Sequence, residues 1–256
     1  MIRTIIALAA VLTALLASSP AAAIIDGEPD SQHPYVGALI ADVPGYGPAP
    51  VCSGTLISPT AYVTAAHCVT DGGMKLLGLS FAQTPLTDPR ILPPLVPIAE
   101  IHVHPDFVPS DIFADVAVIV TASPVTLSGY ATLPGREALA SMLGGKSAFT
   151  VVGYGWEQFL PTSSGLGTRR YTTTRLLGLE YPKKKDHSPG SSALKLTKSQ
   201  GGGGGVCYSD SGGPNFPENS AVLAGITVGV TKNCTGLYWA LRLDTEPILS
   251  FVAQYG

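Results

Sequence analysis

Charged side chains are scarce in this chain of 256 residues: Asp, Glu, Lys and Arg together make up 13% of it, while 45% is hydrophobic. That composition excludes an intrinsically disordered chain, which needs few apolar residues and a high net charge. No stretch reaches the 18 consecutive apolar residues expected of a transmembrane helix. A regular alternation of strands and long helices is also missing, which argues against a parallel α/β sheet.

The first 23 residues predict a secretory signal peptide. Arg3 provides a positive start, residues 5–16 are apolar, and residues 21–23 are three alanines of the kind that signal peptidase recognises. Removing this segment changes the formal net charge from −3 to −4, because it contains one arginine and no acid. A mildly acidic protein has no broad electrostatic attraction for nucleic acid or anionic membranes. We therefore expect a secreted, extracellular monomer that binds neither.

Cysteine is also rare, and an even count in an exported chain predicts two disulfides. The four residues are Cys52, Cys68, Cys207 and Cys234. The sequence alone leaves three pairings open. Zinc ligation is the competing interpretation, but no Cys-x-x-Cys spacing occurs and export disfavours it. We expect no metal and no cofactor.

From residue 24 onward the chain consists of short apolar runs separated by Gly, Pro, Asp and Asn. Their length and their content of Val, Ile, Thr and Tyr are typical of strands. The runs are 35–40, 54–57, 61–65, 98–103, 116–120, 149–152, 221–230 and 238–243. Many short strands predict an all-β fold, either barrels or a sandwich. Surface loops are expected at 42–50, 159–168 and 183–205, and short helices at 136–142 and about 246–255.

One segment near the C-terminus predicts a nucleophile: Ser211, within Cys207-Tyr-Ser-Asp-Ser-Gly-Gly-Pro214. A serine hydroxyl is a weak nucleophile that needs a nearby base, an exposed tight turn and backbone N–H donors for the developing oxyanion. The glycines that follow Ser211 allow a substrate to approach the backbone closely. A bare Ser-Gly-Gly would more often be an ordinary turn, but the longer string with its flanking cysteine is far more specific.

Two further residues complete a possible catalytic set. His67 directly precedes Cys68, and a histidine has a pKa suited to a general base without special tuning. Asp115 opens the apolar strand at 116–120, where a buried carboxylate needs a partner such as a histidine N–H. Asp111 is the nearby alternative, but we interpret it as a loop residue because the uninterrupted strand follows Asp115.

These segments resemble the chymotrypsin/trypsin-like serine proteases, with His, Asp and Ser in the order of that family. The matching segments are Ile24-Ile-Asp-Gly27, Ala65-Ala-His-Cys68, His104-Pro-Asp-Phe107, Asp115-Val-Ala-Val-Ile119, Val152-Gly-Tyr-Gly155 and Asp210-Ser-Gly-Gly-Pro214. The resemblance implies two six-stranded antiparallel β-barrels, at about 24–130 and 131–245, and a short C-terminal helix. It also implies disulfides that join Cys52 to Cys68 and Cys207 to Cys234.

Carried over residue by residue, the resemblance makes His67 the general base, Asp115 its orienting partner and Ser211 the nucleophile. The oxyanion donors would be the backbone N–H groups of Ser209 and Ser211. The family nearly always has glycine at the position of Ser209, where φ is positive. A serine there pays a steric cost, so we expect lower activity than a glycine would allow.

The expected substrate pocket also departs from trypsin. Gly205 stands where trypsin has an acidic residue, so cleavage after Arg or Lys is not supported. Val228 and Val230 flank Gly229 where the family has Ser-Trp-Gly, and we expect a small or medium apolar residue before the cut. In the family a freed N-terminal amine pairs with the equivalent of Asp210. Here the predicted signal-peptide site abuts Ile24, so signal peptidase itself would create the active terminus.

The sequence is compatible with two functions. The first is a secreted serine endopeptidase that hydrolyses protein or peptide substrates through an acyl-enzyme. The alternative is a catalytically weak or inactive homologue that acts as a binding module, which Ser209 and the irregular pocket wall favour. The complete set of His67, Asp115 and Ser211 argues for the enzyme, because a binding scaffold has no physical need for all three.

Overall fold

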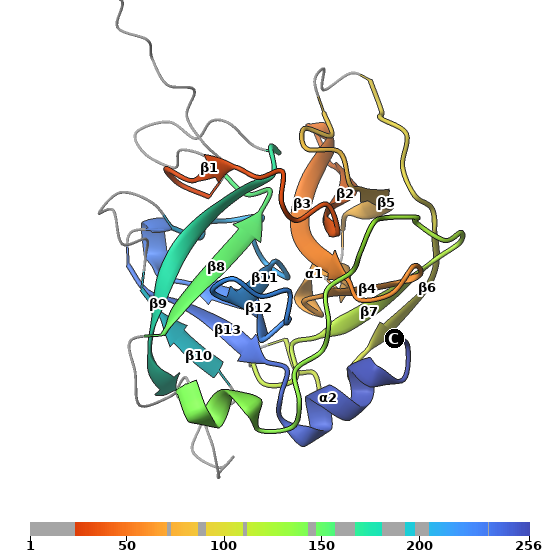
Figure 1. The fold of residues 1–256 in the computed structure, drawn as a ribbon. Coiled ribbons are helices and arrows are strands. Elements are labelled where there is room, and N and C mark those ends of the chain that lie inside the picture. Colours follow the sequence, from red (N-terminus) through yellow and green to blue (C-terminus); the bar gives the residue numbers. More distant parts are fainter. Residues whose placement is uncertain are drawn as a thin grey trace, which may run out of the picture.

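A computed structural model describes residues 24–70, 73–86, 91–109, 112–142, 147–156, 167–180, 193–197, 205–234 and 236–256. The predicted signal peptide, Asp111 and most of the predicted loops at 159–168 and 183–205 lie outside the described residues. The chain folds into two groups of antiparallel strands that lie side by side (Figure 1). Within the described part, no helix is long and apolar enough to cross a membrane.

The N-terminal group is a six-stranded sheet in the order β5-β2-β3-β4-β7-β6. Its strands are β2 (Val36–Val43), β3 (Gly47–Leu56), β4 (Ala61–Thr64), β5 (Lys75–Ser80), β6 (Ile98–Val103) and β7 (Ala117–Thr121). The sheet curls so that Leu79 of β5 forms a bridge with Val96, just before β6. Its inward-facing residues include Leu39, Tyr62 and Ile119, all fully buried.

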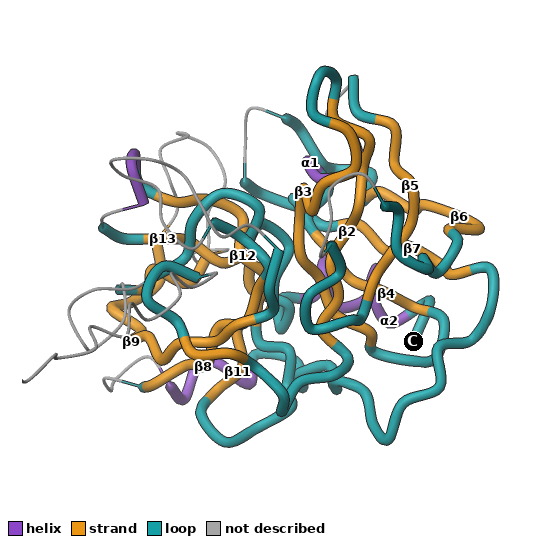
Figure 2. The backbone as a smooth tube through the Cα atoms, turned by 90° about the horizontal axis from the view of Figure 1, so that it is seen from above, coloured by secondary structure: helices purple, strands orange, loops and turns teal. Residues whose placement is uncertain are grey.

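The C-terminal group is a ring of six strands in the order β9-β10-β13-β12-β11-β8. The ring closes because β8 also pairs with β9. Its strands are β8 (Ala148–Gly153), β9 (Arg170–Glu180), β10 (Ala193–Leu196), β11 (Pro214–Pro217), β12 (Gly225–Val230) and β13 (Tyr238–Arg242). The two-residue strand β1 (Glu28–Pro29) adds a seventh strand along β9. The segment that follows Ile24 is thereby attached to the second barrel (Figure 1). Figure 2 shows the two groups of strands side by side from above.

The predicted all-β fold with two antiparallel barrels is confirmed. Both disulfides implied by the resemblance are present: Cys52 is bonded to Cys68 and Cys207 to Cys234. A continuous apolar core joins the barrels, since buried Phe216 and Ile226 of the second barrel cluster with residues of the first. The loop that carries Ser211 and the helix α1 (His67–Thr70) therefore meet over a packed interface.

The C-terminal helix α2 (Glu246–Ala253) lies beneath the first barrel in Figure 1 and ends slightly earlier than predicted. Its apolar face buries Ile248, Phe251 and Val252. Thr245 occupies the N-cap position without a side-chain hydrogen bond. The predicted helix at 136–142 is the 3₁₀ helix Ala138–Met142, and a second 3₁₀ helix spans Lys232–Cys234.

Two of the predicted loops contain strands. The segment 42–50 forms the tip of the β2–β3 hairpin, in which Val43 pairs with Gly47. Its glycines obscured the strand pattern of this hairpin, but Gly45 and Gly47 have φ of 78° and 84° and make the tight turn possible. Within 183–205, β10 pairs with β9 and β13 and buries Leu194. The alternation in β10 is too short to stand out from its polar surroundings.

Candidate active site

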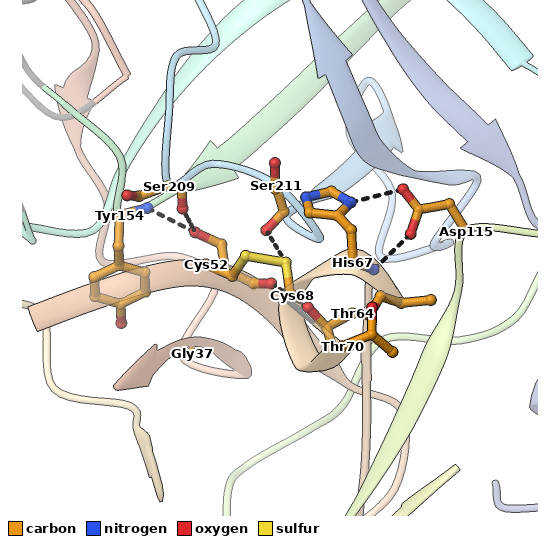
Figure 3. The surroundings of a disulfide bond; sticks show 12 residues. Gly37, Cys52, Thr64, His67, Cys68, Thr70, Asp115, Tyr154, Ser209 and Ser211 are labelled. Carbon is orange, nitrogen blue, oxygen red and sulfur yellow. Dashed lines mark hydrogen bonds and ion pairs between the residues drawn. A yellow bond between two sulfur atoms is a disulfide. The ribbon is translucent and has the colours of Figure 1, made fainter. Parts of the chain in front are cut away.

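The structure brings His67 and Asp115 together at one end of a strand pair in the first barrel, where Thr64 of β4 pairs with Ala117 of β7. β4 ends at Thr64, and His67 opens α1 three residues later; Asp115 lies just before β7, which pairs with β4. The imidazole Nδ1 lies 2.7 Å from Asp115 Oδ2, and the backbone N–H of His67 donates to Asp115 Oδ1 at 2.9 Å (Figure 3).

This arrangement determines which imidazole nitrogen is basic. An ionised carboxylate only accepts hydrogen bonds, so the proton of a neutral His67 ring stays on Nδ1. Nε2 then carries the lone pair. Asp115 is 3% exposed, whereas the His67 side chain is 29% exposed. The ring is therefore anchored on its buried side by Asp115 and offers its basic nitrogen on the accessible side.

Ser211 lies beside this imidazole, on the side away from Asp115 (Figure 3). Its loop is held by Ser53 of β3, whose N–H donates to the Ser211 carbonyl at 2.8 Å. The Ser53 hydroxyl donates to the Ser209 carbonyl at 3.0 Å and accepts from the Tyr154 N–H at 2.9 Å. The sequence did not predict this role for Ser53, because 156 residues separate it from Ser209.

Gly212 cannot be replaced without disturbing the loop. Its φ is 77°, and a Cβ atom built on it would collide with Thr64 Oγ1 and the Ser53 carbonyl. The Gly212 N–H also donates to the carbonyl of Thr227 in β12 at 2.7 Å. The close approach of the first barrel and β12 therefore explains the glycine after the nucleophile.

Ser209 adopts the left-handed conformation, with φ of 70°. Only glycine occupies this region without a steric cost. Within the described part of the chain, no acceptor pairs with the backbone N–H of Ser209 or of Ser211. Two N–H donors next to the hydroxyl of Ser211 are thus free of internal partners, as binding of an oxyanion requires.

Asp210, the residue before Ser211, is fully buried. Its carboxylate accepts hydrogen bonds from the N–H groups of Gly155 at 2.8 Å and Cys207 at 2.9 Å. Burial raises the pKa of Asp210 to about 7, although these two hydrogen bonds lower it. Ile24 is also fully buried, and the next residue, Ile25, pairs with Gly205 through two backbone hydrogen bonds of 2.9 Å.

Two of the residues predicted to form the substrate pocket, Val228 and Val230, lie in β12, whereas Gly205 pairs with Ile25. Val228 is 7% exposed and sits at the register shift between Thr227 and Gly229. Gly229 pairs with Trp239 of β13, which places this tryptophan beside the predicted pocket wall. Val230 is partly buried against the core of the second barrel. β12 bonds to the Ser211 loop through Thr227, so this wall adjoins the nucleophile.

A cavity of about 520 Å³ adjoins Ser211, and no residue of β12 lines it. His67, Ser209 and Ser211 line it, together with the Cys52–Cys68 disulfide. Its remaining walls are Val43, Tyr46, Ala49, Pro50, Val51, Met74, Trp156 and Tyr208. The cavity could not be predicted from the sequence, because these residues come from the β2–β3 hairpin and three separate loops that carry no common motif.

One cluster with metal-binding residue types occurs at the site. Candidate ligand atoms of Cys52, His67 and Cys68 lie within 4.8 Å of one another. The two cysteines are bonded to each other and therefore cannot supply thiolates. The arrangement suits acid–base and nucleophilic chemistry at Ser211 better than metal chemistry.

Several known proteins have sequences similar to this chain. Chymotrypsin-like elastase family member 1 from Felis catus is 29% identical over 172 residues, covering 64% of this chain and 61% of its own length. The chain thus spans about three fifths of the length of these elastases. Kallikrein 1-related peptidase b3 from Mus musculus is 27% identical over 220 residues, which cover 80% of this chain and 81% of that protein.

Solved structures share the fold at lower identity. HL collagenase superposes with a TM-score of 0.67 at 21% identity, over 90% of this chain and 97% of its own. Human heparin binding protein gives a TM-score of 0.65 at 18% identity, over 90% of this chain and 95% of its own. The sequence model of the family described as Trypsin matches residues 24–240. Since that match spans most of the chain, the protein belongs to the chymotrypsin/trypsin-like serine protease family.

Proposed function

We propose that this protein is a secreted serine endopeptidase that hydrolyses peptide bonds through an acyl-enzyme. The observation that supports this most directly is the 2.7 Å contact between His67 Nδ1 and Asp115 Oδ2, with Ser211 on the other side of the imidazole. Asp115 orients the ring, His67 Nε2 acts as the general base, and Ser211 Oγ is the nucleophile.

In the first step Ser211 Oγ attacks the scissile carbonyl carbon while its proton moves to His67 Nε2. The carbonyl oxygen becomes negative and accepts hydrogen bonds from the N–H groups of Ser209 and Ser211. When the intermediate collapses, the C–N bond breaks and the leaving amine takes the proton from His67. Water then attacks the acyl ester by the same route, and His67 returns the proton to Ser211.

We place the active N-terminus at Ile24, after removal of residues 1–23 as a signal peptide. Ile25 already pairs with Gly205, and Ile24 is buried in the second barrel. A free amine at Ile24 would give the buried Asp210 a cationic partner, whereas its hydrogen bonds in the structure come from two backbone amides. The amine would lower the pKa of Asp210 and order the loop that carries Ser211.

We also propose that the enzyme does not select Arg or Lys before the cut. Gly205 has no side chain that could meet a cationic residue, and Val228 and Val230 supply apolar walls. Small or medium apolar side chains fit this composition best. A peptide-library digest tests this: cleavage chiefly after Arg or Lys would contradict the assignment of the pocket.

A fluorophosphonate probe provides the central test. The exported chain is incubated with the probe, the adduct is mapped by mass spectrometry, and the N-terminus is sequenced. We expect a single adduct on Ser211 in protein that begins at Ile24, and no adduct in the Ser211→Ala and His67→Ala variants. Labelling of the variant without His67 at the rate of the unmodified protein would contradict the role of that histidine as the base.

One observation favours a second function, a binding module with little or no turnover. Ser209 holds a conformation that carries a steric cost in every residue but glycine. If the protein began at Ile24 and Ser211 still failed to react, the binding module would replace the enzyme as the proposed function.

A further inference from the structure

The cavity beside His67 adjoins the candidate active site, and the proposed chemistry assigns no part of the substrate to it. Its volume of about 520 Å³ lies within the range of pockets that enclose small ligands. His67, Ser209 and Ser211 form one end of it, so whatever occupies it is continuous with the reacting groups.

The position of the cavity identifies the part of the substrate that would enter it. The leaving amine must lie next to His67 to receive a proton from Nε2, and His67 lines the cavity. The predicted pocket for the residue before the cut lies along β12, and no residue of β12 lines the cavity. The cavity therefore faces the segment that follows the scissile bond.

The composition of the walls identifies the chemistry of that segment. None of the described residues that line the cavity is Asp, Glu, Lys or Arg. Four large side chains with mainly apolar surface line it: Tyr46, Met74, Trp156 and Tyr208. Tyr46 is 75% exposed and Tyr208 is 45% exposed, so a bound side chain would remove apolar surface from water. Aromatic walls of this kind favour aromatic and large aliphatic partners.

We propose that this cavity selects substrates with a large apolar side chain immediately after the cleaved bond. The inference rests on the proposed protease function and deepens it. Tyr46 lies at the turn of the β2–β3 hairpin and Tyr208 on the Ser211 loop, so each barrel contributes one of these lining residues. These two tyrosines would determine the preference through contact with the leaving segment.

Acyl transfer to added amines tests this site separately from the pocket before the cut. The exported protein is acylated with one fixed ester, and glycinamide, leucinamide or phenylalaninamide then competes with water for the acyl-enzyme. The amine nitrogen attacks the ester carbon, its proton passes through His67 to Ser211 Oγ, and an amide forms in place of the acid. The ratio of amide to acid at equal amine concentration measures how well each side chain is bound.

We expect leucinamide and phenylalaninamide to give ratios on the order of tenfold above glycinamide, the scale on which an apolar pocket distinguishes side-chain size. The Tyr46→Ser and Tyr208→Ser variants should each reduce that preference severalfold. Leu177→Ser serves as the matched control, because Leu177 is 56% exposed on β9 and does not line the cavity. It should keep the preference of the unmodified protein.

Equal ratios for the three amines in a protein that hydrolyses the ester would overturn the cavity assignment and leave the protease function intact. A preference that survives both tyrosine variants would also overturn it. Absence of ester hydrolysis together with an unlabelled Ser211 would overturn both proposals.

Discussion

Replacing Ser209 with glycine tests the weakest part of the proposed oxyanion hole. Ser209 has φ of 70°, where a residue with a Cβ atom pays about 1–2 kcal/mol relative to glycine. The hydrogen bond from Ser53 Oγ to the Ser209 carbonyl fixes the peptide group that follows Ser209. A rotation of the preceding peptide group, which carries the Ser209 N–H, would relieve the strain but withdraw that N–H from the oxyanion.

The size of the strain limits the size of the effect. If the cost of about 1–2 kcal/mol is borne only in the arrangement that points both N–H groups at the oxyanion, its removal can raise the acylation rate by roughly 5- to 30-fold. Complete loss of one donor would cost about 10²–10³ in rate, so a gain near that size would mean that Ser209 hardly contributes at present. We therefore expect Ser209→Gly to accelerate acylation within the smaller range.

The assay is a pre-steady-state burst with an activated ester, which measures acylation separately from deacylation. Ser209→Ala is the matched control, because it removes the hydroxyl but keeps the Cβ atom and hence the strain. It should acylate no faster than the unmodified protein. An unchanged or slower rate in Ser209→Gly would refute the reasoning, and an equal gain in both variants would assign the effect to the hydroxyl.

Three further predictions concern the surroundings of the site. Ser53→Ala should lower the free energy of unfolding by about 1–3 kcal/mol in urea titrations and slow acylation, because the buried Tyr154 N–H loses its acceptor. Unchanged acylation would show that Ser53 does not support the Ser211 loop. Arg169→Met should lower the free energy of unfolding by about 3–5 kcal/mol, since it leaves Asp30 buried without the 3.0 Å ion pair. The control Arg136→Met, which breaks the exposed pair with Glu246, should lower it by no more than about 1 kcal/mol. In a chain that keeps residues 1–23, the rise in the Asp210 pKa from 3.8 to about 7 predicts that the free energy of unfolding falls by roughly 3 kcal/mol as pH increases from 4 to 7. A chain that begins at Ile24 should lose much less, and identical pH profiles would contradict the pairing of the amine with Asp210.

The stability of the N-terminal segment should also depend on pH through Asp30. Burial alone would raise the pKa of Asp30, but the hydrogen bond to His33 and the charges of His33 and Arg169 outweigh it and lower the pKa. A carboxyl with a lowered folded pKa contributes stability above its unfolded value near 3.8 and loses it as pH falls below that value. Asp30→Asn should remove this acid-sensitive part of the urea-unfolding profile. A profile that keeps the same acid limb would assign it to other carboxyls.

Local motifs predicted the residues to which the proposed chemistry is assigned. His67 lies next to a cysteine, Asp115 opens an apolar strand, and Ser211 lies in a glycine-rich turn, and each of these patterns is confined to a few neighbouring residues. The strands of highest β-branched content were also located correctly, because side-chain burial in a sheet depends on a short-range pattern. Predictions failed at the β2–β3 hairpin and at β10, where turn residues and polar neighbours obscured that pattern.

The sequence by itself therefore determined the all-β class, the two disulfides implied by family resemblance, and the chemical identity of the candidate site. Only the tertiary structure decided how that site is supported and what surrounds it. Asp30 meets Arg169 across 139 positions, Ser53 meets Ser209 across 156, and the apolar cavity is assembled from four segments. Such contacts follow from the packing of two barrels against each other, and no local pattern of residues encodes which distant side chain will fill a given space.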